Sequence, residues 1–213
     1  MIIAAGLSGA ALLFLISTNF KTDIVEFMAT RGRAARFLSR FDYNAERAMR
    51  IGNYYFNVHH NGVYNLELAE KYFYRALEID PRVPDARHQL ARIEFLRGNF
   101  GGALREINKQ IELHGDSFMA AFYMRGLILG YMGNFQDAES DFKKFLVWDP
   151  KNWATHNDLA WIYFKAGDYS KAEEIARAGL VWNGDNPWLL NVLGVALLNQ
   201  SKQEEARMFL GQA

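Results

Sequence analysis

Hydrophobic and polar residues alternate along most of the chain at helical spacing, and the pattern repeats at a fixed distance. Gly-Asn-Phe stands at residues 98–100 and 133–135, and Gly-Asp-Tyr stands at residues 167–169. Three residues after each tripeptide comes an alanine, and the series of alanines extends in both directions: Ala69, Ala103, Ala138, Ala172 and Ala206. Their spacings of 34, 35, 34 and 34 residues predict an array of similar structural units.

Two further features recur in phase with these alanines. Twelve residues before each alanine lies a small or short residue, at Asn57, Ala91, Gly126, Ala160 and Gly194. Twelve residues after the first four lies a residue that ends helices, at Pro81, Gly115, Pro150 and Gly184. Small residues let two helices approach closely, and a turn glycine tolerates a left-handed backbone. Each unit is therefore predicted to be a pair of helices joined by a short turn.

This pattern resembles the tetratricopeptide repeat, which has a small residue in each helix, Gly and an aromatic residue at the turn, and a final Pro. The resemblance implies an all-α, right-handed superhelix of about 4.5 to 5 repeats over residues 50–213. The expected units are 50–83, 84–118, 119–152, 153–186 and 187–213. The first and last units depart from the turn pattern, as terminal repeats often do, with Tyr64 and Leu66, and Ser201 and Gln203. The sequence stops within the last expected helix, so we expect a partner on that end or a longer natural chain.

The first twenty residues carry no charged side chain, and residues 2–16 are apolar apart from Ser8. As a helix they would span roughly 30 Å, which is close to the thickness of a bilayer core. We interpret residues 1–20 as a transmembrane helix rather than a buried helix or a cleaved signal peptide, which would need a basic start and a small-residue cleavage site. Small residues four apart predict packing against another membrane helix, through Ala4, Ala5, Gly6, Ser8, Gly9 and Ala10.

Basic residues follow the apolar segment and none precedes it. Because Lys and Arg are retained on the cytoplasmic side, a single-pass topology with cytoplasmic repeats is predicted, with the extracytoplasmic side as the alternative. Residues 21–49 have apolar positions at helical spacing and are interpreted as an amphipathic juxtamembrane segment. This segment either lies on anionic lipid or covers the first repeat, and the second interpretation is preferred.

Composition and motifs narrow the possible functions. Lys and Arg together number 24, as do Asp and Glu, so the chain lacks the positive field of a nucleic-acid binder. There is no cysteine, and none of the five histidines has a second ligand at a metal-binding spacing on a helix. No phosphate-binding loop or nucleophile elbow is present. We therefore expect no metal, no cofactor, no small-molecule substrate and no enzymatic activity.

In the family that this chain resembles, the first helix of each unit lines a concave groove. The resemblance implies a groove that is mostly aromatic and aliphatic, which suits an apolar peptide or an amphipathic helix. It lacks the Lys and Asn set with which some members clamp acidic C-termini. The implied groove residues are Tyr54, Val58, His88, Arg92, Phe95, Tyr123, Leu127, Tyr131, Asn157, Trp161, Phe164, Lys165, Trp188 and Asn191.

Tryptophan is frequent at protein interfaces but also packs between repeats. Trp148 and Trp182 stand one repeat apart and are expected to pack, whereas Trp161 and Trp188 are expected to bind. Together these features predict a scaffold or assembly factor that is tethered to a membrane complex and binds other proteins, including a membrane protein. The alternative is a permanent structural subunit of a larger membrane-associated assembly, and an enzyme with an unrecognised site ranks third.

Overall fold

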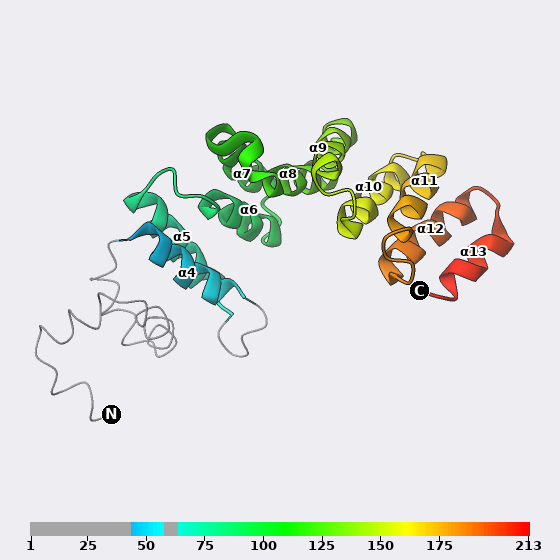
Figure 1. The fold of residues 1–213 in the computed structure, drawn as a ribbon, viewed down its shortest axis with the longest axis horizontal. Helices are drawn as coiled ribbons and strands as arrows, with labels where there is room; N and C mark the ends of the chain where they lie inside the picture. The colour runs from blue at the N-terminus through cyan, green and yellow to red at the C-terminus, as the bar shows by residue number, and fades with distance from the viewer. Residues whose placement is uncertain (1–43, 58–63) are drawn as a thin grey trace, which may run out of the picture. The chain divides into compact units, whose positions relative to one another are not determined.

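The computed structural model describes residues 44–57 and 64–213. The expected transmembrane helix, its packing residues and most of the 21–49 segment therefore lie outside the described ranges. Within those ranges the chain forms ten α-helices and one short 3-10 helix, without a strand (Figure 1). The helices are α4 (Ala45–Phe56), α5 (Leu66–Ile79), α6 (Ala86–Leu96), α7 (Phe100–His114), η1 (Gly115–Phe118), α8 (Ala120–Tyr131), α9 (Phe135–Trp148), α10 (Trp153–Lys165), α11 (Tyr169–Leu180), α12 (Pro187–Asn199) and α13 (Gln203–Leu210).

The chain divides into two compact units, Met1–Ala86 and Arg87–Ala213. The first contains α4 and α5, which pack on each other, and the second extends from α6, at the boundary, to α13. In the second unit the helices alternate as first and second helices of successive repeats. Helices α7 to α13 each pack on their neighbours in the chain, and α6 shares a core cluster with α7 and α8. The all-helical repeat architecture expected from the sequence is confirmed for the described residues.

The short turns of the second unit use a left-handed residue at the same place in every repeat. Gly98, Gly133 and Gly167 have φ values of +75°, +82° and +82°. In the last repeat Ser201 takes this position with φ 63°. Because a side chain disfavours this conformation, the three glycines are explained by backbone geometry alone.

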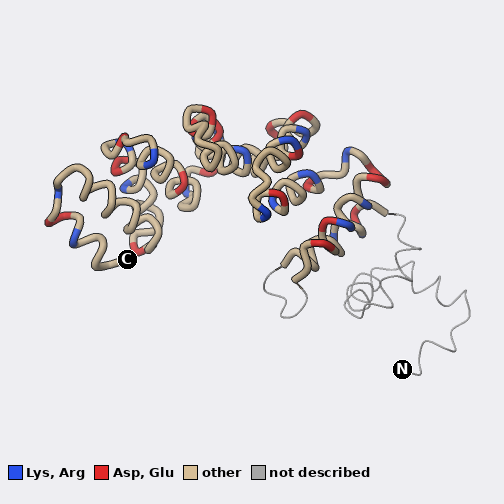
Figure 2. The backbone as a smooth tube through the Cα atoms, turned by 180° about the vertical axis from the view of Figure 1, so that it is seen from behind, with Lys and Arg blue, Asp and Glu red and all other residues tan. Residues whose placement is uncertain are grey.

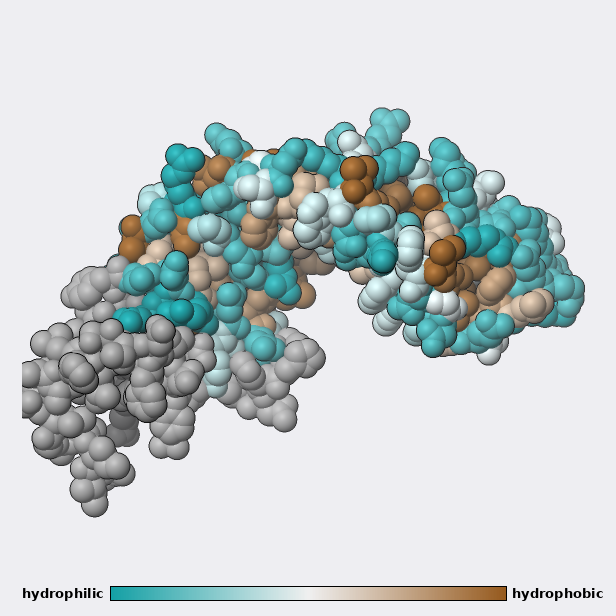
Figure 3. Space-filling model, viewed as in Figure 1, coloured by the Kyte–Doolittle hydropathy of each residue, from teal (hydrophilic) through white to brown (hydrophobic). Residues whose placement is uncertain are grey.

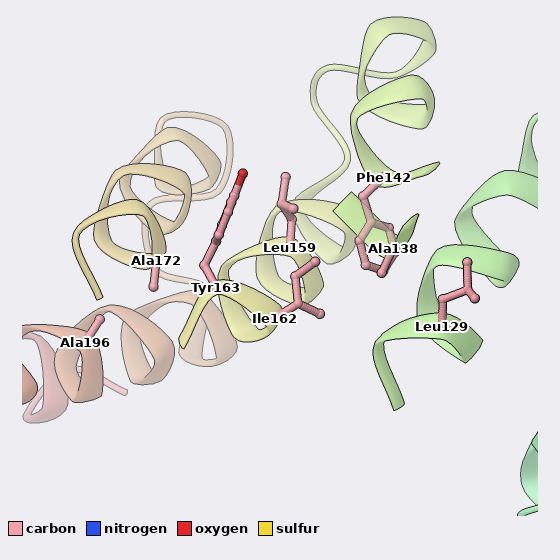
Figure 4. Close-up of a cluster of buried hydrophobic side chains, with 8 residues drawn as sticks. All are labelled: Leu129, Ala138, Phe142, Leu159, Ile162, Tyr163, Ala172 and Ala196. Atoms are coloured by element: carbon pink, nitrogen blue, oxygen red, sulfur yellow. The ribbon is translucent and has the colours of Figure 1, made fainter. Parts of the chain in front are cut away.

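A continuous hydrophobic core runs through the second unit because each helix pair shares side chains with the next. The repeat alanines of its second helices are fully buried: Ala103, Ala138, Ala172 and Ala206. One cluster gathers residues of five successive helices, α8 to α12 (Figure 4): Leu129, Ala138, Phe142, Leu159, Ile162, Tyr163, Ala172 and Ala196. Neighbouring repeats therefore stabilise one another, as in other solenoids.

The first unit follows the same plan in a different register. In the second unit Gly126 faces Phe142 and Gly194 faces Leu210, each pair 16 residues apart. In the first unit it is Gly52 that faces Phe73, at a distance of 21 residues. The expectation that Asn57 is the small residue of the first helix is therefore wrong. The first helix, α4, begins at Ala45, and its connection to α5 spans residues 57–65, whereas the turns within repeats of the second unit span only residues 97–99, 132–134 and 166–168.

The surface of the described residues is mixed in character. Acidic and basic residues are interspersed along the helices (Figure 2). Hydrophobic side chains form separate patches between hydrophilic ones (Figure 3). None of the helices in the described part of the chain has the length and hydropathy needed to span a bilayer.

Candidate partner-binding face

Three successive first helices, α6, α8 and α10, are joined by a row of aromatic side chains. The ring centroid of Tyr131 lies 5.0 Å from that of Phe95 and 5.4 Å from that of Trp161, on which it stacks. We call Phe95, Tyr131 and Trp161 the aromatic row. Tyr131 is 53% exposed, and the other two are partly buried. The row thus presents aromatic surface to solvent across three repeats.

Trp161 has two roles in this arrangement. Its ring contacts Tyr131, and its side chain also packs against the core clusters that link α10 with α8 and α12. Lys165, one turn further along α10, places its Nζ 5.8 Å from the Trp161 ring. Trp161 therefore supports the fold as well as the exposed row, whereas Tyr131 contributes mostly to the surface.

Beside the row, Tyr123 of α8 donates a hydrogen bond from its hydroxyl to Oδ2 of Asp158 on α10, at 2.7 Å. Asn157 donates from Nδ2 to Oδ1 of the same carboxylate, at 3.1 Å. Burial raises the pKa of Asp158, although both hydrogen bonds act to lower it. Burial, followed by the charge and hydrogen bond of Asp158, raises the pKa of Tyr123. The pair links two repeats through a partly buried carboxylate.

Asp158 is a member of this face that the sequence analysis misses. It stands 35 residues after Tyr123, which is one repeat period. Residues one period apart lie on adjacent first helices, so the spacing itself could have shown that an acid faces a tyrosine here. The family positions led to Asn157 instead, which touches Asp158 from the preceding residue.

The other expected groove residues have varied surroundings. Leu127 packs partly buried against the core, and Phe164 lies 5.5 Å from the ring of Tyr169. His88 lies 5.3 Å from the ring of Phe118, and the Arg92 guanidinium donates to Gln89. On α12, Trp188 is 62% exposed and Asn191 is also exposed. The structure therefore brings the row, Tyr123, Asn157 and Lys165 together between α6 and α10, without linking Trp188 to them by a ring contact among the described residues.

Tyr54 and Val58 depend on the register of the first unit. With Gly52 as its small residue, the positions equivalent to these two move five residues toward the N-terminus, to Met49 and Asn53. Met49 is buried and Asn53 is exposed. Val58 lies outside the described residues, and Tyr54 is partly buried in the first unit.

The ends of two second helices expose a repeated pair of hydrophobic residues. Val147 and Trp148 close α9 with exposures of 88% and 63%, and Val181 and Trp182 follow α11 with 76% and 50%. The expectation that these tryptophans are packed between repeats is wrong, because each lies where its helix ends and the chain turns to the next unit. Lys151 covers one face of Trp182, with Nζ 5.1 Å from the ring centroid.

The described residues contain no group of three or more His, Asp and Glu side chains that could hold a metal ion. His156 is buried, and its Nε2 lies 3.0 Å from the carbonyl oxygen of Pro150. This contact ties α10 to the turn before it. The side chains described on the face between α6 and α10 include aromatic rings, the aliphatic Leu127 and the Asp158 carboxylate.

Comparison with known proteins agrees with this architecture. The family model "Tetratricopeptide repeat" matches residues 131–193. Human tetratricopeptide repeat protein 6 is 26% identical over 151 residues, which cover 68% of this chain. The match covers 28% of that protein, so this chain spans just over a quarter of the relative's length.

Several solved structures share the fold. PilW, described as a widely conserved type IV pilus biogenesis factor, has a TM-score of 0.74 at 17% identity, covering 92% of this chain and 93% of PilW. MamA of Desulfovibrio magneticus RS-1 has a TM-score of 0.69 at 16% identity, covering 80% and 93%. YrrB, described as a TPR protein with an unusual peptide-binding site, has a TM-score of 0.64 at 16% identity, covering 84% and 89%. The tetratricopeptide-repeat model thus matches residues 131–193, and the solved structures show that the chain shares the fold of such repeat proteins.

Proposed function

We propose that this chain is a protein-interaction scaffold or assembly factor whose second unit binds an apolar peptide or helix on the face of α6, α8 and α10. The aromatic row is the observation that carries the proposal. It offers accessible ring surface on three helices, and its exposed member Tyr131 is held between two rings. Large, rigid aromatic side chains supply much of the binding energy at protein interfaces.

The proposal includes attachment to a membrane complex through residues 1–20. Its support is the uncharged, apolar character of this segment and the basic residues that follow it. PilW, which shares the fold, is described as a pilus biogenesis factor. A tethered repeat domain of this kind would hold a partner close to the membrane.

The binding site is tested with peptides selected from a random display library on the purified chain. We expect Tyr131→Ala to weaken the selected peptides by about thirtyfold, or about 2 kcal/mol, because it removes a ring that a partner would bury. Trp148→Ala is the matched control, since it truncates an exposed aromatic residue at the end of α9. The measurement is peptide affinity by fluorescence anisotropy, with melting temperature recorded for every variant.

The opposite result for these two variants would contradict the proposed position of the binding surface. If Trp148→Ala weakens the peptides and Tyr131→Ala does not, the binding surface lies at the ends of the second helices. Added salt should weaken binding only a little, because apolar contacts are not screened. Lys165→Ala should also have a small effect, whereas Trp161→Ala is expected to lower both affinity and melting temperature.

A second candidate function is that of a permanent structural subunit. The observation that favours it is the exposure of four hydrophobic residues, Val147, Trp148, Val181 and Trp182. A repeated hydrophobic pair on the outside of the repeats is the kind of surface that a neighbouring subunit covers. The two functions differ in the behaviour of the isolated chain in detergent. A scaffold is expected to elute as one soluble species in size-exclusion chromatography, whereas a subunit that has lost its neighbours is expected to aggregate.

A further inference from the structure

Asp158 differs in its neighbours from Asp141, Glu106 and Glu173, three ion-paired acids of the second unit. Asp141 is paired with Arg125, Glu106 with Arg87, and Glu173 with Lys202 and Arg177. Asp158 accepts hydrogen bonds from Tyr123 and Asn157, both neutral, and no cation among the described residues lies at ion-pair distance from it. Burial raises its pKa, because an ionised carboxylate loses hydration there, and the two hydrogen bonds offset only part of this effect.

The basic side chain of α10, Lys165, is not the cation that would pair with Asp158. Lys165 lies two helical turns further on, with Nζ over the ring of Trp161. The two groups that donate hydrogen bonds to the carboxylate are neutral: the Tyr123 hydroxyl of α8 and the side-chain amide of Asn157, which precedes Asp158 on α10. A carboxylate that has lost much of its hydration without gaining a cation is costly to keep in place. The same carboxylate attracts an incoming cation more strongly than an exposed one does.

The surroundings of Asp158 suit a long basic side chain. Trp161 follows three residues later, and this spacing places both on the same side of α10. An aromatic ring next to a carboxylate can hold the aliphatic stem of a Lys or Arg while its charged end reaches the oxygens. Tyr131 stacks on that ring and continues the aromatic surface toward α6.

We propose that the face between α8 and α10 binds a peptide segment carrying a Lys or Arg whose cation pairs with Asp158 while neighbouring apolar side chains contact Tyr131 and Trp161. This inference rests on the proposed peptide-binding function and specifies its partner. Asp158 then selects for a basic residue, and the aromatic row supplies the contact area. The cost of burying the carboxylate is offset when the partner arrives.

The test compares random peptide libraries selected on the wild-type chain and on Asp158→Asn. The substitution removes the charge and keeps an oxygen that can accept the Tyr123 hydrogen bond. On the wild type we expect selected peptides to share a Lys or Arg at a fixed distance from an aromatic or aliphatic residue. On Asp158→Asn the hydrophobic residue should remain and the basic one should lose its preference.

A matched pair of peptides makes the test quantitative. Replacing the shared Lys or Arg of a selected peptide by Gln should weaken binding to the wild type about tenfold. The same replacement should change binding to Asp158→Asn by less than about twofold. Glu174→Gln, which removes an exposed charge from α11, is the control variant and should retain the full tenfold difference.

The outcomes separate this inference from the function on which it rests. If wild-type selection enriches apolar peptides without a basic residue, the scaffold function stands and the role of Asp158 is wrong. The same conclusion follows if Asp158→Asn retains the full preference. If no peptide is enriched, the peptide-binding function fails and this inference fails with it. The comparison of the two peptides on the wild type needs no variant, so equal binding of both peptides would overturn the inference even if Asp158→Asn folds poorly.

Discussion

Gly126 shows how a single residue controls helix packing in this fold. A Cβ atom at this position would lie 3.0 Å from the ring of Phe142 and 3.3 Å from the carbonyl oxygen of Ala138. The backbone oxygen cannot move without displacing α9, so the absence of a side chain lets α8 and α9 approach. Gly101, in contrast, lies exposed in α7, where an added Cβ would meet only Arg105, at 3.9 Å.

Gly126→Ala is therefore expected to lower the free energy of unfolding by about 1–3 kcal/mol, because the added methyl overpacks the contact with α9. Gly101→Ala is the matched change and should be neutral or stabilising, by at most about 1 kcal/mol, because alanine favours a helix over glycine. Urea denaturation followed by circular dichroism measures both. Equal effects of the two substitutions would contradict the close packing of α8 on α9.

Asp158 is the residue at which stability should depend on pH in an unusual direction. Its pKa in the folded chain is raised above the unfolded value of about 3.9, so folding favours the protonated acid. Its contribution is thus most favourable below the unfolded pKa and is lost as pH rises through the folded pKa. We expect Asp158→Asn to raise the melting temperature by a few degrees at neutral pH and to give no gain at acid pH. Thermal melts of both proteins at the two pH values measure the difference, and a lower melting temperature of the variant at neutral pH would show that the charge stabilises the fold.

At the scale of the helices, ion pairs join elements that the hydrophobic core already holds together. The Arg125 guanidinium of α8 makes two hydrogen bonds to the Asp141 carboxylate of α9, at 2.6 and 2.8 Å, and a third to Asn108 of α7. The hydrogen bond to Asp141 is the main cause that raises the pKa of Arg125. Glu173 of α11 plays a similar part: burial raises its pKa, but hydrogen bonds from Lys202, Arg177 and Gln200 bring the pKa below its usual value.

Removing Arg125 leaves the buried Asp141 without its cation. Arg125→Ala is expected to destabilise the chain by about 2–3 kcal/mol, with the partial exposure of Arg125 limiting the effect. Replacing both partners by apolar residues, as in Arg125→Met with Asp141→Leu, should recover part of that loss because no charge stays buried. The free energy of unfolding from urea titrations gives both values. A double variant that is less stable than Arg125→Ala would contradict the view that the unpaired Asp141 carboxylate causes the loss.

Most of the helix pattern could be predicted from the sequence, for a physical reason. The small residues and turn glycines recur because each repeat must satisfy the same close approach and the same left-handed turn, as Gly126 and Gly133 show. The first unit departs from this pattern because its connection, residues 57–65, is longer, and the period places Tyr64 where the other units have the turn glycine. The period alone therefore placed the small residue at Asn57, five residues from Gly52, which faces Phe73.

The binding face was predicted less completely than the fold. Family positions identify the aromatic row because the first helices repeat in geometry, and Phe95, Tyr131 and Trp161 occupy them. They do not identify Asp158, whose significance comes from the lack of a cation around it and not from its own position. The exposure of Trp148 and Trp182 was also not predicted from the sequence. The burial of a residue at a helix end depends on how the chain turns after the helix, which the repeat pattern does not give.

For the whole molecule, the predicted membrane topology has a direct test. The chain has no cysteine, so Ser170→Cys, exposed on α11, would be its single thiol. With the repeats in the cytoplasm, an impermeant thiol reagent added to intact cells should leave Ser170→Cys unlabelled and should label Ile2→Cys on the other side. Labelling of Ser170→Cys from outside would place the repeats on the extracytoplasmic side.

The distribution of tryptophan also makes the two units optically distinguishable. All five tryptophans fall between Trp148 and Trp188, within the unit Arg87–Ala213, and the first unit has none. Trp161 is the one held between Tyr131 and the core, so its emission is expected to shift when the repeats around α10 unfold. Circular dichroism at 222 nm, in contrast, reports helices of both units. A loss of helix signal that precedes any change in emission would therefore come from helices that precede α9 and carry no tryptophan, which gives the chain an internal, label-free reporter of where unfolding begins.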